Sequence, residues 1–337
     1  MSELPGRTCP IRYHYGARAI ASAPVRETEV LYVIGGLYGN IYALRAIQAL
    51  IAEEAQAGPR VRACFNGDFN WFNVSEQDFV EINQGVSQHD AIVGNVEAEL
   101  ASDDLSAGCG CAYPSQVSDE VVERSNKIFE RLHGTALRHA AIRQYFRSLP
   151  MFARYQVAGQ YVGIVHGDFE SLAGWRFDEN ALRSETDQGW LQDAFREAKV
   201  DVFASSHTCL PVLKQLDETS LLKPLASSEA NPVPRATVKA VINNGAAGMP
   251  NFTNTHYGVI SRIGLRPATK NVLHSARVGE LYVEALRVDF DHLAWSAHFL
   301  KSWPKGSEAY ESYFARICDG PSFDLGQAYR VACLQWA

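Results

Sequence analysis

The sequence predicts an α/β fold, because short apolar strands are followed by segments with helical periodicity. Residues 30–34 form a continuous apolar run that is typical of a buried strand. In residues 41–51, leucine and isoleucine side chains recur on one face of a helix. The turn at residues 35–40 lies where α/β proteins usually place their chemistry, yet it contains no acid, base or cation. It is therefore a phosphate-binding loop, a structural turn or a site that has lost its reactive side chains.

One pattern recurs along the chain: an apolar strand ends, and small or polar residues follow it directly. It occurs at residues 30–36, 61–68, 90–97, 161–168, 200–208 and 238–245. The carboxyl ends of parallel strands share one edge of a sheet, so side chains that are distant in sequence converge there.

The chain divides into an N-terminal arm (1–28), a main domain (29–300) and a C-terminal helical tail (301–337). The main domain carries an insertion at residues 98–150. Apolar periodicity predicts helices at about 119–133, 137–148 and 187–198, a loop or hairpin at 216–234, and antiparallel strands at 257–263 and 280–290. The tail is broken at residues 319–321.

Composition indicates a globular protein of 337 residues, and 47% hydrophobic residues are enough for a sizeable core. The net charge of -7 argues against binding long nucleic acids or anionic membranes. The longest uncharged stretch, 240–261, is too polar to span a membrane. Seven cysteines without regular disulfide spacing fit a reducing compartment, and no signal peptide is visible, so we expect a cytoplasmic location.

The polar residues at the strand ends form a mixed set of oxygen and nitrogen donors. They are Asp68, Asn95, Glu97, His166, Asp168, His207, Cys209, Asn243 and Asn244. Such a set suits one divalent transition metal (Zn, Mn or Fe) better than Mg alone. The chain contains no G-x-S-x-G elbow, and the turn at 35–40 has neither dinucleotide-binding nor P-loop spacing.

These blocks resemble the calcineurin-like metallophosphoesterase family, whose motifs run D-x-H, G-D, G-N-H-D/E, H-G and G-H-x-H. The resemblance covers about residues 29–290, with the motifs in the same order. The corresponding stretches are 36–40, 67–68, 94–97, 166–167 and 206–209, and residues 243–248 resemble the N-P-G-S-x-G loop of compact bacterial members. The resemblance implies a four-layer α/β/β/α sandwich with a two-metal centre at the strand ends.

In that family one metal would be held by residues that this chain retains: Asp68, Asn95, His166 and His207. Asp68 would bridge the two metals.

The second metal would need ligands that this chain lacks. Gly36 and Tyr38 stand in place of the Asp and His of D-x-H, and Cys209 in place of the last His of G-H-x-H. The His of G-N-H, which assists the attack or the leaving group, is Val96. We therefore expect one intact half-site and one degenerate half-site.

The resemblance and the residue chemistry together assign roles. Asp68, His166 and Tyr38 are the candidate catalytic residues, with Tyr38 as a hydrogen-bond donor to a phosphoryl oxygen. Cys209 is either a thiolate ligand or a small buried residue, and the Cys109–Cys111 loop either contributes to the site or is structural. The candidate substrate-binding residues are Asn40, Glu97, Asp168, Asn243 and Asn244, and hydrogen bonding within the fold is the alternative for Glu97 and Asp168.

Three functions follow. The first is an atypical metal-dependent phosphoesterase, a hydrolase acting on a small phosphomonoester, phosphodiester or nucleotide. The second is an inactive member that serves as a binding or regulatory protein, and the third is different chemistry at a rebuilt cysteine site.

The aromatic residues of the C-terminal tail form either a homodimer patch or a face that packs against the sandwich. They are Trp303, Tyr310, Tyr313 and Phe314.

Overall fold

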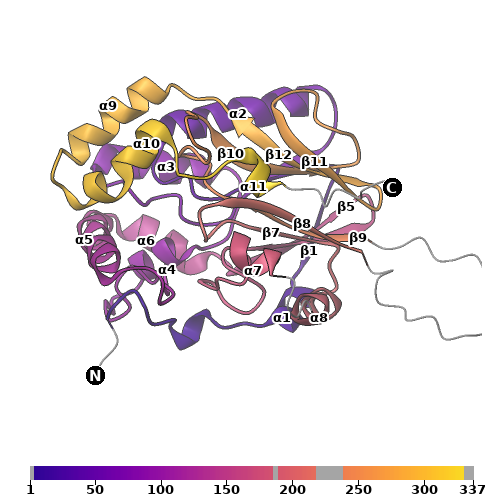
Figure 1. The fold of residues 1–337 in the computed structure, drawn as a ribbon, viewed down its shortest axis with the longest axis horizontal. Helices are drawn as coiled ribbons and strands as arrows, with labels where there is room; N and C mark the ends of the chain where they lie inside the picture. Colours follow the sequence, from indigo (N-terminus) through magenta and orange to yellow (C-terminus); the bar gives the residue numbers. More distant parts are fainter. Residues whose placement is uncertain (1–3, 185–188, 218–237, 330–337) are drawn as a thin grey trace, which may run out of the picture.

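The computed structural model describes residues 4–184, 189–217 and 238–329. Two six-stranded sheets pack face to face and helices cover both outer faces, which gives four layers (Figure 1). This arrangement confirms the predicted α/β/β/α sandwich. Among the described residues, no helix has the length and apolar character needed to cross a bilayer.

The first sheet has the order β1-β5-β6-β7-β9-β8. Its strands are β1 (Val25–Thr28), β5 (Phe152–Val157), β6 (Gln160–Val165), β7 (Val202–Ser205), β8 (Pro211–Asp217) and β9 (Val238–Asn244). Since β6, β7 and β9 run parallel, their carboxyl ends meet at one edge.

The second sheet has the order β11-β12-β10-β2-β3-β4. Its strands are β2 (Val30–Ile34), β3 (Val61–Phe65), β4 (Asp90–Ala91), β10 (Gly258–Gly264), β11 (Val272–Val278) and β12 (Leu281–Val288). Here β2, β3 and β4 run parallel. The antiparallel pairing of β10 with β12 confirms the strands predicted near the end of the main domain.

Helices enclose the sheets. The outer face of the second sheet carries α2 (Ile41–Gln56), α3 (Glu76–Val86) and α9 (His292–Ser302), and the opposite face of the molecule carries α1 (Ala17–Ala21), α7 (Glu179–Arg183) and α8 (Gly189–Ala198) (Figure 1). At one end lie α4 (Asn95–Ala101), α5 (Asp119–Ala136) and α6 (Ala140–Ser148). The short elements are η1 (Ile11–Tyr13), the π-helical turn η3 (Tyr310–Phe314), α10 (Ala315–Asp319) and α11 (Leu325–Ala328).

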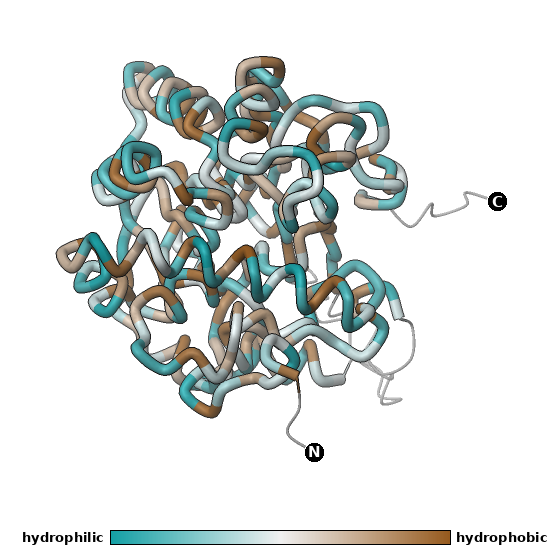
Figure 2. Tube along the Cα trace, turned by 90° about the vertical axis from the view of Figure 1, so that its left-hand side faces the viewer, coloured by the Kyte–Doolittle hydropathy of each residue, from teal (hydrophilic) through white to brown (hydrophobic). Residues whose placement is uncertain are grey.

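The core between the sheets is apolar. Leu31, Val33 and Cys64 of the second sheet pack in one cluster with Tyr155 and Ile164 of the first. Figure 2 shows brown and teal alternating along the outer helices, as expected for helices that bury one face. The apolar packing holds the two sheets together, and so the polar strand ends of one sheet lie beside those of the other.

Most predicted helices are confirmed, because their apolar periodicity matches the buried faces. The insertion contains α5 and α6, and α8 occupies the predicted helix at 187–198 from Gly189 onward. Residues 218–234 of the predicted loop or hairpin lie outside the described residues. The division into arm, domain and tail stays a prediction, although β1 pairs with β5 and so extends the first sheet.

Candidate metal centre

Both sheets contribute to a cluster of buried polar side chains at the strand ends. Asp68 follows β3 and Asn95 begins α4 just after β4, while His166 follows β6 and His207 follows β7. The ligand-type atoms of Asp68, His166 and His207 lie within 4.8 Å of one another. The structure therefore brings together the four residues predicted for the intact half-site.

The atoms at the centre of the cluster are close enough to share one ion. His166 Nε2 lies 3.3 Å from Asp68 Oδ1, 3.0 Å from Asn95 Oδ1 and 3.2 Å from His207 Nδ1. Ligand atoms around a tetrahedral zinc ion at about 2.0–2.1 Å lie about 3.3 Å from one another. The three separations measured from His166 Nε2 are close to that value.

Backbone groups set which way each ligand presents its lone pair. His166 Nδ1 lies 2.7 Å from the carbonyl oxygen of Asn66, which only accepts, so Nδ1 carries the proton. His207 Nε2 likewise donates to the carbonyl oxygen of Cys111 at 3.1 Å. Asn95 Nδ2 donates to the carbonyl oxygen of Cys109 at 2.9 Å, which turns its amide oxygen toward the centre.

The backbone amide of Val96 donates to Asp68 Oδ1 at 3.3 Å. When His166 is neutral, four acceptor atoms nevertheless face one another at the centre of the cluster. They are Asp68 Oδ1, Asn95 Oδ1, His166 Nε2 and His207 Nδ1. Buried acceptors without a donor are costly, and a cation removes that cost. Carbonyl oxygens that accept a hydrogen bond from the other ring nitrogen of a histidine are a usual support of metal sites. The donor set fits one divalent transition metal.

The charges of the cluster act on one another. Burial alone would raise the pKa of Asp68, but His166 and His207 together bring it below its ordinary value. Burial opposes protonation of His166, yet the Asp68 carboxylate raises the pKa of His166 overall. Burial and His166 lower the pKa of His207 to about 3, so His207 is neutral at physiological pH.

The turns that carry the ligands adopt constrained backbone conformations. Asp68 has φ +54°, in the left-handed region that side chains other than glycine rarely enter. A Cβ atom on Gly67 would lie 2.5 Å from Gly94 Cα and 2.6 Å from His166 Nδ1. Only glycine allows this close approach of the two turns.

The second half-site is closed by contacts within the protein. The Tyr38 hydroxyl lies 2.8 Å from Cys209 Sγ, and the thiol also donates to the carbonyl oxygen of His207 at 3.2 Å. Burial raises the pKa of Tyr38 well above its ordinary value and also raises that of Cys209. Both residues have positive φ, +53° and +63°. Cys209 Sγ thus lies beside Tyr38, and its role as a ligand stays a prediction.

The Cys109–Cys111 loop folds over the centre and meets it mainly through its backbone. Its carbonyl oxygens orient Asn95 and His207, while Cys111 Sγ lies 3.5 Å from Asn95 Nδ2. Trp175 Nε1 donates to the Cys111 carbonyl oxygen at 3.1 Å, and its ring meets His207 edge to face at 5.2 Å. The insertion therefore supports the candidate metal ligands Asn95 and His207.

The two carboxylates that neighbour the site make hydrogen bonds with backbone amides. Glu97 accepts from Asp68 N at 2.8 Å, from Phe69 N at 3.1 Å and from Asn70 N at 3.2 Å. Burial and the Asp68 charge raise the pKa of Glu97 to about 7. Asp168 accepts from the amides of residues 170, 171 and 176. These bonds match the hydrogen-bonding alternative, and the substrate roles stay predictions.

The predicted substrate-binding amides are also bonded within the fold. Asn40 caps α2 by accepting from two amides and donates to the carbonyl oxygen of Gly248. Asn243 donates to Thr208 Oγ1 at 2.8 Å. Asn244 donates to the carbonyl oxygen of Gly35 at 3.0 Å, and its own buried Oδ1 has no hydrogen-bond partner among the described residues. Their contact with a substrate stays a prediction.

Sequence reasoning missed Arg316, which the C-terminal tail places beside the second half-site. Its Nη2 donates to the carbonyl oxygen of Cys209 at 2.8 Å. The aromatic residues of the tail pack within the chain: Trp303 is fully buried, and Tyr313 and Phe314 pack against the core under α9. No sequence motif surrounds this arginine in the tail, so the sequence did not predict its position beside the site.

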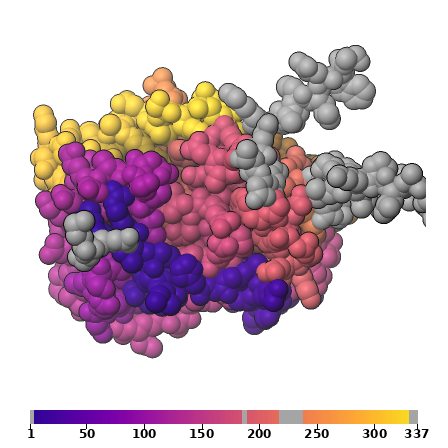
Figure 3. Space-filling view, turned by 60° about the horizontal axis from the view of Figure 1, so that its bottom comes forward, coloured from indigo at the N-terminus to yellow at the C-terminus, as the bar shows by residue number. Residues whose placement is uncertain are grey.

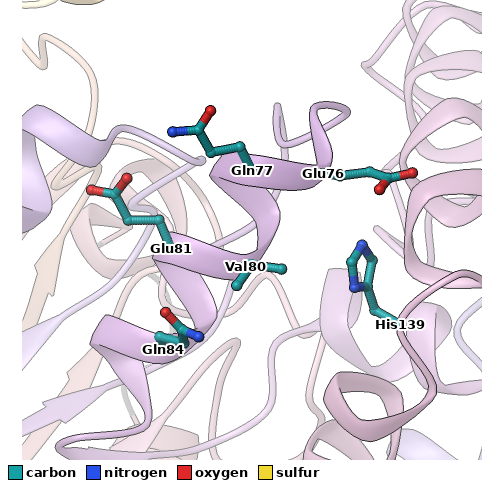
Figure 4. A pocket seen from close by; sticks show the side chains of 6 residues that line it. All are labelled: Glu76, Gln77, Val80, Glu81, Gln84 and His139. Carbon is teal, nitrogen blue, oxygen red and sulfur yellow. The ribbon is translucent and has the colours of Figure 1, made fainter.

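A depression elsewhere on the surface contains none of the predicted site residues. Figure 4 shows its lining, which comes from α3 and from the residue just before α6: Glu76, Gln77, Val80, Glu81, Gln84 and His139. The side chains there are mostly polar and open to solvent. It offers no set of converging ligands like that at the strand ends.

Comparison with solved structures identifies the fold. A metallophosphoesterase from Sphaerobacter thermophilus superposes with a TM-score of 0.51 and 17% identity, covering 87% of this chain and 100% of that one. A hypothetical protein from Pyrococcus horikoshii gives a TM-score of 0.55 and 14% identity, covering 87% and 99%. No protein-family profile and no curated protein sequence matches the chain. The chain thus has the metallophosphoesterase fold over most of its length, with a buried Asp/His/His group that can hold a metal.

Proposed function

We propose that this protein is a metal-dependent phosphoesterase that works with one divalent transition metal, Zn, Mn or Fe. The four inward-facing acceptor atoms of Asp68, Asn95, His166 and His207 carry the proposal. Its substrate is a small phosphomonoester, phosphodiester or nucleotide, since the net charge of -7 disfavours a polyanion.

When bound, a transition metal lowers the pKa of a coordinated water and polarises a phosphoryl oxygen. The chain holds the ligands rigidly, because Asn66, Cys109 and Cys111 fix the orientation of three of them through carbonyl oxygens. Tyr38 stays protonated, and its hydroxyl would donate to a phosphoryl oxygen by exchanging its hydrogen bond to Cys209 Sγ. Val96 supplies no acid, so we expect slower turnover than a site with histidine there provides.

A non-catalytic metal-binding protein is the second candidate. The contact between Tyr38 and Cys209 favours it, because the two side chains satisfy each other where a second metal would need ligands. The burial of His166 and Asn95 points the same way, since access for a substrate is narrow.

The deciding experiment combines elemental analysis with a hydrolysis screen. Protein purified without chelators or a metal-affinity tag should contain about one metal atom per chain. Loaded protein is then tested on aryl phosphomonoesters, aryl phosphodiesters and nucleotides, beside a His207→Ala variant and a His14→Ala control at an exposed position. Turnover lost only in His207→Ala supports the phosphoesterase. One tightly bound metal with no turnover on any substrate contradicts it and leaves the non-catalytic protein.

A further inference from the structure

The C-terminal tail brings a positive charge to the half of the site that lacks metal ligands. Arg316 lies on α10, and its Nη2 donates to the Cys209 carbonyl oxygen at 2.8 Å. Its Nε donates to the carbonyl oxygen of Pro250 at 3.1 Å. Two carbonyl bonds therefore hold the guanidinium next to the residue that replaces a metal-binding histidine.

The charge of Arg316 is not neutralised by a carboxylate in the part of the chain that the structure describes. Ion pairs involve many of the other described arginines, but none within 4.0 Å includes Arg316. Carbonyl oxygens position a guanidinium while leaving its full charge and its remaining N–H groups for an anion.

The segment that carries Arg316 is fixed to the sandwich from several sides. His292 Nε2 donates to the Ile317 carbonyl oxygen at 2.6 Å, and His256 Nε2 donates to that of Cys318 at 3.0 Å. Thr253 Oγ1 donates to the Pro321 carbonyl oxygen at 2.9 Å. In Figure 3 the yellow C-terminal segment runs along the top of the face, above the pink central part of the chain. A cation held this way needs little rearrangement to meet a ligand.

We propose that Arg316 binds the phosphoryl group of the substrate in the place of the lost second metal, so that the Tyr38–Cys209 half of the site is an anion-binding site. This deepens the proposed phosphoesterase function and rests on it for the identity of the ligand. A second metal requires anionic or imidazole ligands, which Gly36 and Tyr38 do not supply. A guanidinium brings its own positive charge, and its planar N–H groups match the oxygens of a phosphate.

Binding of inorganic phosphate to the metal-loaded full chain tests this. Calorimetry should give an affinity that Arg316→Gln weakens by about tenfold or more, because a charge-assisted contact is lost. Thr253→Val is the matched control, since it removes the hydroxyl contacts with Pro321 and Phe323 that hold the same tail but leaves every charge in place. It should change the phosphate affinity by less than about twofold. Metal content per chain should stay the same in all three proteins.

Equal phosphate affinities in the wild type and Arg316→Gln, with equal metal content, would overturn the proposal. A measurement on the unmutated chain covers the case in which Arg316→Gln fails to fold. Inorganic phosphate should protect Arg316 from phenylglyoxal, as located by mass spectrometry, and an unchanged modification rate would also overturn the proposal.

The failures of the two proposals are distinguishable. Turnover of phosphoesters with phosphate binding that is independent of Arg316 overturns the anion site and leaves the phosphoesterase. Phosphate binding that depends on Arg316, without turnover of any ester, supports the anion site and contradicts the phosphoesterase.

Discussion

The two halves of the candidate metal centre differ in where their polar atoms find partners. In the half built from Asp68, Asn95, His166 and His207, acceptor atoms face each other and their donors are spent on the surrounding backbone. In the other half, Tyr38 and Cys209 bond to each other. The first half is suited to a cation from outside, whereas in the second half the Tyr38 hydroxyl and the Cys209 thiol bond to each other.

The largest effect is expected from removing a ligand of the first half. His166→Ala should lower metal affinity by more than about 100-fold, because removing only a group that orients a ligand already costs about 10–100-fold. Competition with a chelator measures it, and His14→Ala at the exposed N-terminal position should match the wild type. An affinity within about threefold of the wild type would mean that His166 is no ligand.

Glu97→Gln tests how firmly the turn that carries Asp68 is held. One carboxylate oxygen accepts from Asp68 N and Gly94 N, the other from Phe69 N and Asn70 N. Either orientation of a glutamine amide sets an NH2 group against backbone donors. We expect a loss of unfolding free energy on the order of 3 kcal/mol.

Chemical denaturation measures this loss, and the exposed Glu53→Gln variant should change stability by less than about 0.5 kcal/mol. A Glu97→Gln protein as stable as Glu53→Gln would show that these amides do not depend on the carboxylate.

Metal affinity should depend on pH through His166. The Asp68 carboxylate raises the pKa of His166 above its ordinary 6.5 despite burial, and a protonated imidazole cannot bind a metal. Below that raised pKa each bound metal must displace about one proton, so affinity should fall about tenfold per pH unit, and above it affinity should level off. His207, with a pKa of about 3, adds nothing in this range.

Calorimetry from about pH 5 to about pH 8, in buffers of different ionisation enthalpy, measures the metal affinity and the number of protons released when the metal binds. A metal affinity that does not change with pH would show that protonation of His166 does not compete with metal binding.

The smallest effect is expected in the second half. Tyr38→Phe removes one hydrogen bond to Cys209 and should cost about 1 kcal/mol of stability while metal content per chain stays the same. Elemental analysis and thermal unfolding check both points. A fall in metal content would contradict the view that the two halves of the site are independent, because Tyr38 would then support the candidate ligands of the first half.

The sequence predicted the fold and the intact half-site because both depend on local patterns. Apolar strands that end in a polar residue recur before Asp68, Asn95 and His166, and the parallel pairing of β6 with β7 brings His207 to the same edge. Strands β1, β5, β8 and β11 were not predicted, and the structure identifies them by their pairing with neighbouring strands.

By itself, the sequence determined which candidate ligands are present and in what order, and its family resemblance predicted that Gly36, Tyr38 and Cys209 stand in a degenerate half-site. Tertiary structure decided what each polar atom bonds to. Glu97 accepts from backbone amides, the carbonyl oxygens of the Cys109–Cys111 loop accept from candidate ligands, and Arg316 donates to the Cys209 carbonyl oxygen. The reason is physical. A residue type limits the chemistry that a position can offer, but the direction of a lone pair or of a charge depends on partners that packing brings from distant parts of the chain.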